Sequence, residues 1–118
     1  MRRRLLKSKI HRATVVRGDL HYEGSLTLGR ALMAAADLVP YEFVHITNIN
    51  SGAHWVTYAL EDPDHPEMVC MNGTAARHFL PGDPIIVLAY ADVEDREARA
   101  HHPRTVHVDG QNRVVRVE

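Results

Sequence analysis

The apolar residues of this chain are gathered in short runs, and a glycine, proline or asparagine ends almost every run within about ten residues. Several runs are rich in β-branched residues and alternate apolar with polar side chains, as half-buried strands do. Only two segments have the composition of a helix, and both are short. The pattern therefore predicts a mainly β fold, a small closed barrel with short flanking helices, rather than a parallel α/β sheet.

Turn signals divide the chain into elements whose bounds can be predicted. The first helix is rich in Ala, Leu and Met and stops before Pro40, and Pro103 stops the second. A continuous apolar run within residues 82–93 predicts a strand that is buried on both faces. We predict helices at residues 29–38 and 94–102, one helical turn within residues 72–79, strands at residues 9–16, 42–49, 53–60, 68–71 and 82–93, and a terminal hairpin at residues 105–117.

Length, composition and charge limit the classes of protein to which this chain can belong. The 118 residues, of which 45% are hydrophobic and 25% charged, predict one globular domain over residues 1–118. A core of that size is modest, so oligomerisation would add stability. The net charge of −1 gives no electrostatic footprint for nucleic acid. The single cysteine, Cys70, excludes an internal disulfide and fits a reducing cytosol.

Several kinds of site lack support in the sequence. The nine histidines are scattered and form no HExxH motif, so we predict no metal site. There is no Walker loop and no GxGxxG motif. No apolar run approaches the roughly 20 residues of a membrane span. The basic start, with Arg2, Arg3 and Arg4, lacks the apolar segment of a secretory signal. We therefore expect a cytoplasmic protein whose arginines lie on a solvated first strand rather than on phosphate.

Two features are candidates for chemistry, and the residues alone leave both open. Gly24-Ser25 follows the polar and aromatic approach "HYE"; such a dipeptide is usually a turn, although glycine also adopts the strained conformations found at a reacting peptide. Lys7 and Lys9 are the only lysines. Lys9 starts an apolar strand, where it either points into a site or protects a sheet edge from aggregation.

Both candidates, Gly24-Ser25 and Lys9, lie within longer sequence strings. They are "KIHRATV" (9–15), "DLHYEGS" (19–25), "GAHWVTYAL" (52–60), "NGTAA" (72–76) and "PGDPIIVLAY" (81–90). In this order, over nearly the whole chain, they resemble the aspartate 1-decarboxylase family, the pyruvoyl-dependent enzymes that make β-alanine for pantothenate and coenzyme A synthesis. "HYEGS" after "KIHRA" is specific, whereas several small barrel families share the glycine-aspartate string. The resemblance favours chemistry over a plain turn at Gly24-Ser25.

The resemblance implies self-cleavage between Gly24 and Ser25. The Ser25 hydroxyl would attack the Gly24 carbonyl and turn the amide into an ester. Elimination and hydrolysis would then leave residues 1–24 as a β chain and residues 25–118 as an α chain with a pyruvoyl N-terminus. No external base is evident, so preorganised geometry must carry much of the step. Thr57 matches a threonine tied to processing and to substrate binding in the family.

The resemblance also assigns roles in decarboxylation. L-aspartate would form an imine with the pyruvoyl group, which draws electrons as CO2 leaves. Tyr58 matches the family's proton donor, and Lys9 matches a lysine that contacts carboxylate. Taken alone, Tyr58 also fits a packing role and "NG" a plain turn. The remaining matches are a loop that cradles substrate and two residues near the cleaved bond: Asn72, Gly73, Thr74, Ala75, His11 and Tyr22.

The implied fold is a double-psi β-barrel, and the implied assembly is a homotetramer with its sites at subunit interfaces. Two positions depart from the family. His54 stands where a carboxylate-binding arginine is usual, and Thr74 stands where alanine is usual. Histidine offers fewer donors and titrates near neutrality, so we expect weaker substrate binding as pH rises. Alternatively Arg77 or another basic residue compensates, or the preferred acid is not aspartate.

Two rival functions stay open at this point. Small barrels with a "PGDPIIV"-like string include swapped-hairpin DNA-binding domains, and the start of this chain is basic. The chain could also be an unprocessed, catalytically silent homologue, or an enzyme whose cleavage needs a maturation factor. The net charge and "HYEGS" argue against the DNA-binding module.

Overall fold

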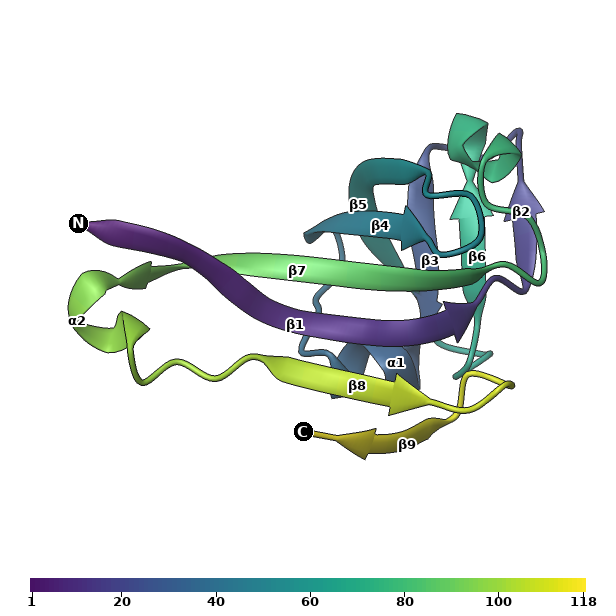
Figure 1. The fold of residues 1–118 in the computed structure, drawn as a ribbon. Helices are drawn as coiled ribbons and strands as arrows, with labels where there is room; N and C mark the ends of the chain where they lie inside the picture. Colours follow the sequence, from purple (N-terminus) through teal and green to yellow (C-terminus); the bar gives the residue numbers. More distant parts are fainter.

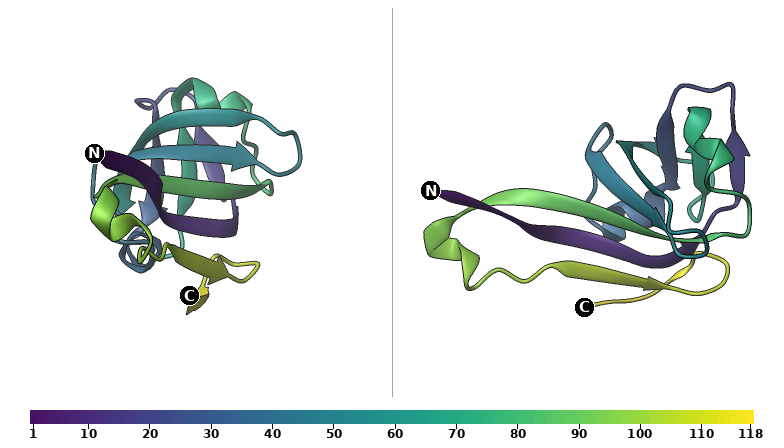
Figure 2. Two further views of the ribbon diagram at one scale, coloured as in Figure 1. Left: turned by 60° about the vertical axis from the view of Figure 1, so that its left-hand side comes forward. Right: turned by 45° about the horizontal axis from the view of Figure 1, so that its top comes forward.

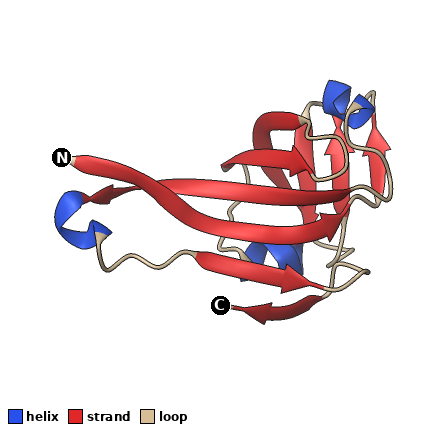
Figure 3. Cartoon of the chain, in the orientation of Figure 1, coloured by secondary structure: helices blue, strands red, loops and turns tan.

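Strands make up most of the chain, and the helices are short pieces at its margins (Figure 3). The computed structural model describes all of residues 1–118. Its strands are β1 (Arg2–Thr14), β2 (Arg17–Asp19), β3 (Ser25–Gly29), β4 (Phe43–Asn48), β5 (His54–Asp62), β6 (Val69–Asn72), β7 (Pro84–Glu94), β8 (Arg104–Val108) and β9 (Val114–Val117). The helices are α1 (Arg30–Ala35), the 3₁₀ helix η1 (Gly73–Arg77) and α2 (Asp95–Ala98). The prediction of a mainly β fold with short helices is confirmed; the double-psi topology stays a prediction.

The nine strands form one mixed sheet in the order β2-β6-β3-β5-β4-β7-β1-β8-β9. Three neighbouring pairs, β1–β8, β2–β6 and β3–β5, are parallel, and the others are antiparallel. Figure 1 shows β1 and β7 as a long ribbon that reaches past the other strands to the N-terminus, while β2, β3 and β6 stand at its opposite end. Viewed from the side of the N-terminus, the strands curve round a common centre (Figure 2, left).

The first strand starts at Arg2, well before the predicted residue 9. The first residues of β1 are stabilised by β7, because Arg2 and Arg4 lie opposite Glu94 and Asp92 and pair with their carboxylates. These arginines are exposed, which confirms the solvated first strand. β1 lies between β7 and β8, so the alternative of Lys9 as an edge-strand residue is wrong.

The core lies on the inner face of the curved sheet. It includes Ile10, Leu26, Leu28, Leu32, Val44, Ile46, Phe79 and Ile85. Burial along β7 alternates, with Ile85, Val87 and Ala89 buried and their neighbours more exposed. The prediction that this strand is buried on both faces is therefore wrong, because no second layer covers the outer face of the sheet within one chain. An uncovered outer face allows polar site residues to reach solvent.

Several other elements match their predicted type but not their length. The antiparallel pairs β4–β5 and β8–β9 confirm the two hairpins. The first helix ends at Ala35 instead of residue 38, since Asp37 adopts a left-handed conformation with φ of 55°. The second spans only Asp95–Ala98. None of the helices has the length and apolar character needed to cross a bilayer.

Candidate active site

The bond between Gly24 and Ser25 joins an exposed loop to a buried strand. The loop from β2 to β3 is shaped by Asp19, whose carboxylate accepts a hydrogen bond from the His21 amide (3.2 Å) and whose carbonyl accepts one from the Tyr22 amide (3.3 Å). Gly24 is exposed at a bend, whereas Ser25 is only 1% exposed. The peptide expected to react is thus held at the first residue of β3, where the chain turns inward.

Ser25 is held by hydrogen bonds on both sides of its hydroxyl. The hydroxyl donates to the Glu23 carbonyl (3.0 Å) and accepts from the Asn72 side-chain amide (3.0 Å). Asn72 lies directly opposite Ser25 in the β3–β6 pair, and its amide also donates to Thr27 (2.9 Å). The Cys70 thiol donates to the carbonyl oxygen of the Asn72 side chain (3.2 Å), which fixes the orientation of the amide. The position of the Ser25 oxygen is therefore strongly constrained.

Gly73 closes the bend from the other side. It has a left-handed φ of 77°, and a Cβ built on it would stand 2.7 Å from the Gly24 Cα and 3.0 Å from the Gly24 nitrogen. Only glycine can approach the loop this closely. The rest of the predicted cradle continues into η1, where Thr74 is exposed and Ala75 is buried. The structure thus brings Asn72 and Gly73 directly to the Gly24-Ser25 bond.

Tyr58 lies beside the same bond on the neighbouring strand. Ser25 and Tyr58 each precede the first residue pair of the parallel β3–β5 register, Leu26 with Ala59. The Tyr58 side chain is half-buried, and its ring lies 6.3 Å from that of Tyr41.

Thr57 pairs with buried Val44 and so points to the inner face of the sheet. The two neighbouring candidates on β5 therefore face opposite sides.

Tyr41 is held in a conformation that costs energy. Its φ is 72°, which is unusual for a bulky residue. Backbone hydrogen bonds from the Tyr41 amide to the Ala59 carbonyl (2.7 Å) and from the Ala59 amide to the Glu42 carbonyl (2.9 Å) hold this segment against β5. Sequence reasoning missed Tyr41, because a positive φ at a non-glycine residue leaves no signal in composition or spacing.

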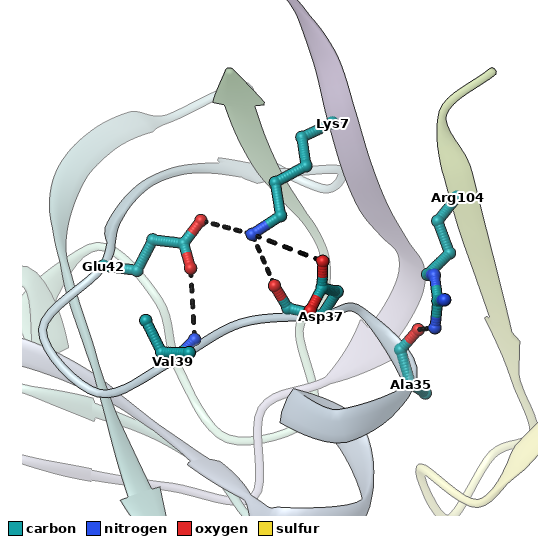
Figure 4. Close-up of polar contacts among 6 residues, drawn as sticks. All are labelled: Lys7, Ala35, Asp37, Val39, Glu42 and Arg104. Carbon is teal, nitrogen blue, oxygen red and sulfur yellow. Dashed lines mark hydrogen bonds and ion pairs between the residues drawn. The ribbon is translucent and has the colours of Figure 1, made fainter. Parts of the chain in front are cut away.

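The two lysines have different environments. Lys7 donates to the Glu42 carboxylate (2.8 Å) and to the Asp37 carbonyl, so it ties β1 to the segment between α1 and β4 (Figure 4). Glu42 in turn accepts from the Val39 amide (3.1 Å), and nearby Arg104 donates to the Ala35 carbonyl (3.1 Å). Lys9 forms no hydrogen bond or ion pair, which leaves its ammonium group available.

Lys9 and His11 lie on a different wall of the molecule from Ser25. β5, β4 and β7 lie between β3 and β1 in the sheet, and no hydrogen bond or ion pair joins Lys9 to Ser25 or Asn72. The Nδ1 atom of His11 is buried without a partner. Burial, followed by the charges of Lys9, His107 and Arg12, lowers the pKa of His11 below its ordinary value. The predicted site residues therefore form two groups within one chain.

His54 is engaged within its own sheet. Its Nε2 atom lies 3.3 Å from Nδ1 of His45, and its Nδ1 atom lies 3.4 Å from the Thr47 hydroxyl. It is four residues before Tyr58 on β5, which corresponds to about 13 Å along a strand. The structure does not bring His54 into contact with Ser25. Arg77, the proposed substitute, is an exposed residue at the end of η1.

A groove of about 630 Å³ lies beside the buried Ser25 side chain. Asn72 and Thr27, the side chains joined by a hydrogen bond next to Ser25, line it together with Tyr22. Arg17 and Tyr41 also line it, and no motif in the sequence marks either as a site residue. The structure contains no group of three or more His, Cys, Asp or Glu side chains arranged to hold a metal ion.

Comparison with known proteins gives a consistent result. The family model described as aspartate decarboxylase matches residues 1–115. A protein of Moorella thermoacetica named aspartate 1-decarboxylase is 47% identical over 118 residues, covering all of this chain and 92% of the relative. Relatives of the same name from Salinibacter ruber and Dehalococcoides mccartyi are 47% and 44% identical, covering 95% and 97% of this chain and 77% and 92% of their own lengths.

Proposed function

This chain belongs to the aspartate decarboxylase family, and from that premise we propose that it converts L-aspartate to β-alanine and CO2 with a pyruvoyl group made from its own Ser25. The resemblance set out from the sequence is confirmed by these matches. One observation carries the proposal: the Ser25 hydroxyl is buried and held by Asn72 at a bend against which Gly73 is packed. The product would serve pantothenate and coenzyme A synthesis in the cytoplasm.

The first reaction is cleavage between Gly24 and Ser25. The Ser25 Oγ atom bonds to the Gly24 carbonyl carbon, and the Gly24–Ser25 C–N bond breaks to give an ester and a free amine. Elimination then releases residues 1–24 with a terminal carboxylate and leaves a dehydroalanine at position 25. Hydrolysis of the dehydroalanine replaces its nitrogen with oxygen and releases ammonia. Asn72 restrains the attacking oxygen, so little conformational freedom is lost on approach. From the resemblance, Thr57 is also proposed to assist through its hydroxyl, although its side chain lies on the other face of β5 from Tyr58.

The residues around Ser25 fit a pyruvoyl group at this position. The Asn72 amide, which points at the Ser25 oxygen, is a suitable donor to a carbonyl oxygen. Such a ketone would bond to the substrate's amine and accept electron density from the α-carbon as CO2 leaves. Tyr58, at the start of the adjacent strand, is proposed to return a proton to that carbon. Thr74, Ala75 and Tyr22 complete the surrounding wall.

The separation of Lys9 from Ser25 supports an oligomeric enzyme. Lys9 has a free ammonium group but lies on β1, with β5, β4 and β7 between it and β3. We propose a homotetramer in which Lys9 and His11 of one copy face the Ser25 pocket of another. The outer face of the sheet carries exposed Phe43, Val56 and Tyr90, which such an assembly would cover.

Intact mass under denaturing conditions tests the proposal. We expect two chains, residues 1–24 and 25–118, with a blocked N-terminus on the longer one. We also expect β-alanine to form from L-aspartate. A single chain of 13.3 kDa after prolonged warm incubation, without activity, would contradict the proposal and favour a binding module or a silent homologue. Restoration of cleavage by a cell extract would instead identify a need for a maturation factor.

Two serine variants sharpen the test. Ser25→Ala removes the attacking oxygen and should leave one intact chain without activity. Ser51→Ala is the matched control, because Ser51 lies in the exposed β4–β5 turn, where its hydroxyl accepts a hydrogen bond from the Ala53 amide (3.2 Å). Its chain should be cleaved like the wild type. Cleavage of Ser25→Ala at the same bond would exclude Ser25 as the nucleophile.

A further inference from the structure

The groove beside Ser25 contains a cationic side chain that the rest of the molecule does not use. Arg17 lies on β2 opposite Cys70 of β6, and Asp19 lies opposite Asn72. Side chains at opposed positions share a face of the sheet, so Arg17 lies on the same side as Cys70 and Asn72, both of which line the groove. The register places the Cα atoms of Arg17 and Asn72 about 8 Å apart. An arginine side chain can cover that separation.

The other charged groups of the groove are mostly engaged. The Arg30 guanidinium lies 3.7 Å from the Glu61 carboxylate. The Asp62 carboxylate accepts hydrogen bonds from the His65 ring (3.0 Å) and from the Asp64 amide (2.9 Å). Asp19 also lines the groove, and one of its oxygens accepts from the His21 amide.

Arg17, in contrast, forms no ion pair and no hydrogen bond through its side chain. Its nearest acidic neighbour along β2, Asp19, is not within ion-pair distance. The groove therefore holds a guanidinium group whose five donors are unoccupied, next to the residue that is expected to react. A free guanidinium beside a polar pocket is suited to a carboxylate, which it can bind with two parallel hydrogen bonds.

Within its own chain, His54 is poorly placed for the same task. Both of its ring nitrogens already have partners, His45 and Thr47, so a carboxylate would have to displace one of them. It lines a separate, shallow hollow with Trp55 and Val56. It also lies about 13 Å along the strand from the level of Tyr58, and an imidazole is shorter than an arginine side chain.

We propose that Arg17 binds the carboxylate that the substrate retains, from within the groove beside Ser25, and so provides the cationic contact that His54 does not. This inference rests on the proposed decarboxylation. The substrate class it selects is a short amino dicarboxylic acid, whose second carboxylate reaches the guanidinium while its amine lies at Ser25. Tyr22 and Tyr41 also line this groove.

The direct test measures binding without cleavage or turnover. Succinate, a dicarboxylate without an amine, is titrated by calorimetry into the intact Ser25→Ala protein and into the same protein carrying Arg17→Gln, Arg17→Lys, His54→Gln or Arg116→Gln. We expect Arg17→Gln to raise the Kd for succinate at least about tenfold and Arg17→Lys to raise it less. His54→Gln should have little effect. Arg116→Gln, which removes the same charge from exposed β9, should have none.

The second measurement uses the cleaved enzyme with Ser25 present. Arg17→Gln should raise the KM for L-aspartate about tenfold and leave the fraction of cleaved chain unchanged. The inference is overturned if succinate fails to bind the parent Ser25→Ala protein, or if His54→Gln weakens binding while Arg17→Gln does not. An uncleaved wild-type chain would contradict the proposed function, whereas the succinate titration would still report on the groove.

Discussion

The surroundings of Ser25 and the ribbon formed by β1, β7 and β8 differ in whether their polar side chains have hydrogen-bond partners. Around Ser25, the side chains of Asn72, Thr27 and Cys70 are joined in one buried hydrogen-bonded group. On the ribbon, Lys9 has no partner and His11 has a buried nitrogen without one. A satisfied network fixes geometry within one chain, whereas unpaired polar groups need something from outside. The first region can support an intramolecular reaction, and the second is suited to receive a ligand or another copy.

The largest effect that would test this comparison is expected from Gly73→Ala. The new Cβ would meet Gly24 at 2.7 Å and displace the bend, so cleavage should be abolished or slowed by at least about a hundredfold. Intact mass against time measures the rate. Gly52→Ala is the matched control, since Gly52 has the same φ of 77° but no atom within 4 Å of its Cβ position. It should lose about 1 kcal/mol of stability and still be cleaved.

A smaller effect is expected from Asn72→Ala. The Ser25 hydroxyl loses its donor, and the Cys70 thiol loses its acceptor, so cleavage should slow about tenfold and stability should fall by about 1 kcal/mol. Asn50→Ala serves as the control, because Asn50 is exposed and its amide donates to Asp83 far from the bend (3.2 Å). Equal cleavage rates in the two variants would show that the buried network does not orient Ser25.

Lys7→Met examines the ribbon. The Lys7–Glu42 pair is partly buried, with side-chain exposures of 23% and 19%, and the variant leaves the Glu42 carboxylate with one donor fewer. We expect the free energy of unfolding to fall by about 1 kcal/mol, measured by urea denaturation, with the cleavage rate unchanged. The double variant Lys7→Met with Glu42→Gln should recover part of the loss. A slower cleavage rate in Lys7→Met would mean that the two regions are coupled.

The smallest effect is the pH dependence contributed by His11. Its pKa is lowered in the folded protein, mainly by burial, so the unfolded chain binds the proton more tightly. Stability from this group is therefore complete above about pH 6.5 and declines as the pH falls below that value. His11→Gln should flatten the curve of unfolding free energy against pH below about pH 6.5. An unchanged slope would assign the pH dependence to other groups.

The elements of the fold were predicted more accurately than their ends and their partners. Hairpins such as β4–β5 follow from local turn signals, which depend on a few adjacent residues. The early start of β1 was missed because its arginines are paired across the ribbon by acidic residues near residue 94, a contact without local signal. The short strand β2 was missed for a similar reason, since it exists only as a partner of β6.

Ser25, Asn72 and Gly73 could be selected from the sequence because they lie in strings that resemble a known family. Arg17 and Tyr41 could not, since Arg17 lies in a three-residue strand defined by its pairing with β6 and Tyr41 is distinguished only by its φ. His54 was singled out as a departure from the family, but its engagement by His45 and Thr47 depends on the β4–β5 register. Spatial partners across strands are set by register, which a single sequence does not specify.

The sequence by itself determined the chemistry available to this protein: a glycine-serine bond in a specific string, one tyrosine and one asparagine-glycine loop matched to it, and a mainly β fold. The tertiary structure alone decided which of these groups meet. Parallel pairing of β3 with β5 and antiparallel pairing with β6 bring Tyr58 and Asn72 to either side of Ser25, whereas Lys9 is carried to another wall. The physical reason is that residue type sets what a side chain can do, while long-range hydrogen bonding and burial of the core set where it lies.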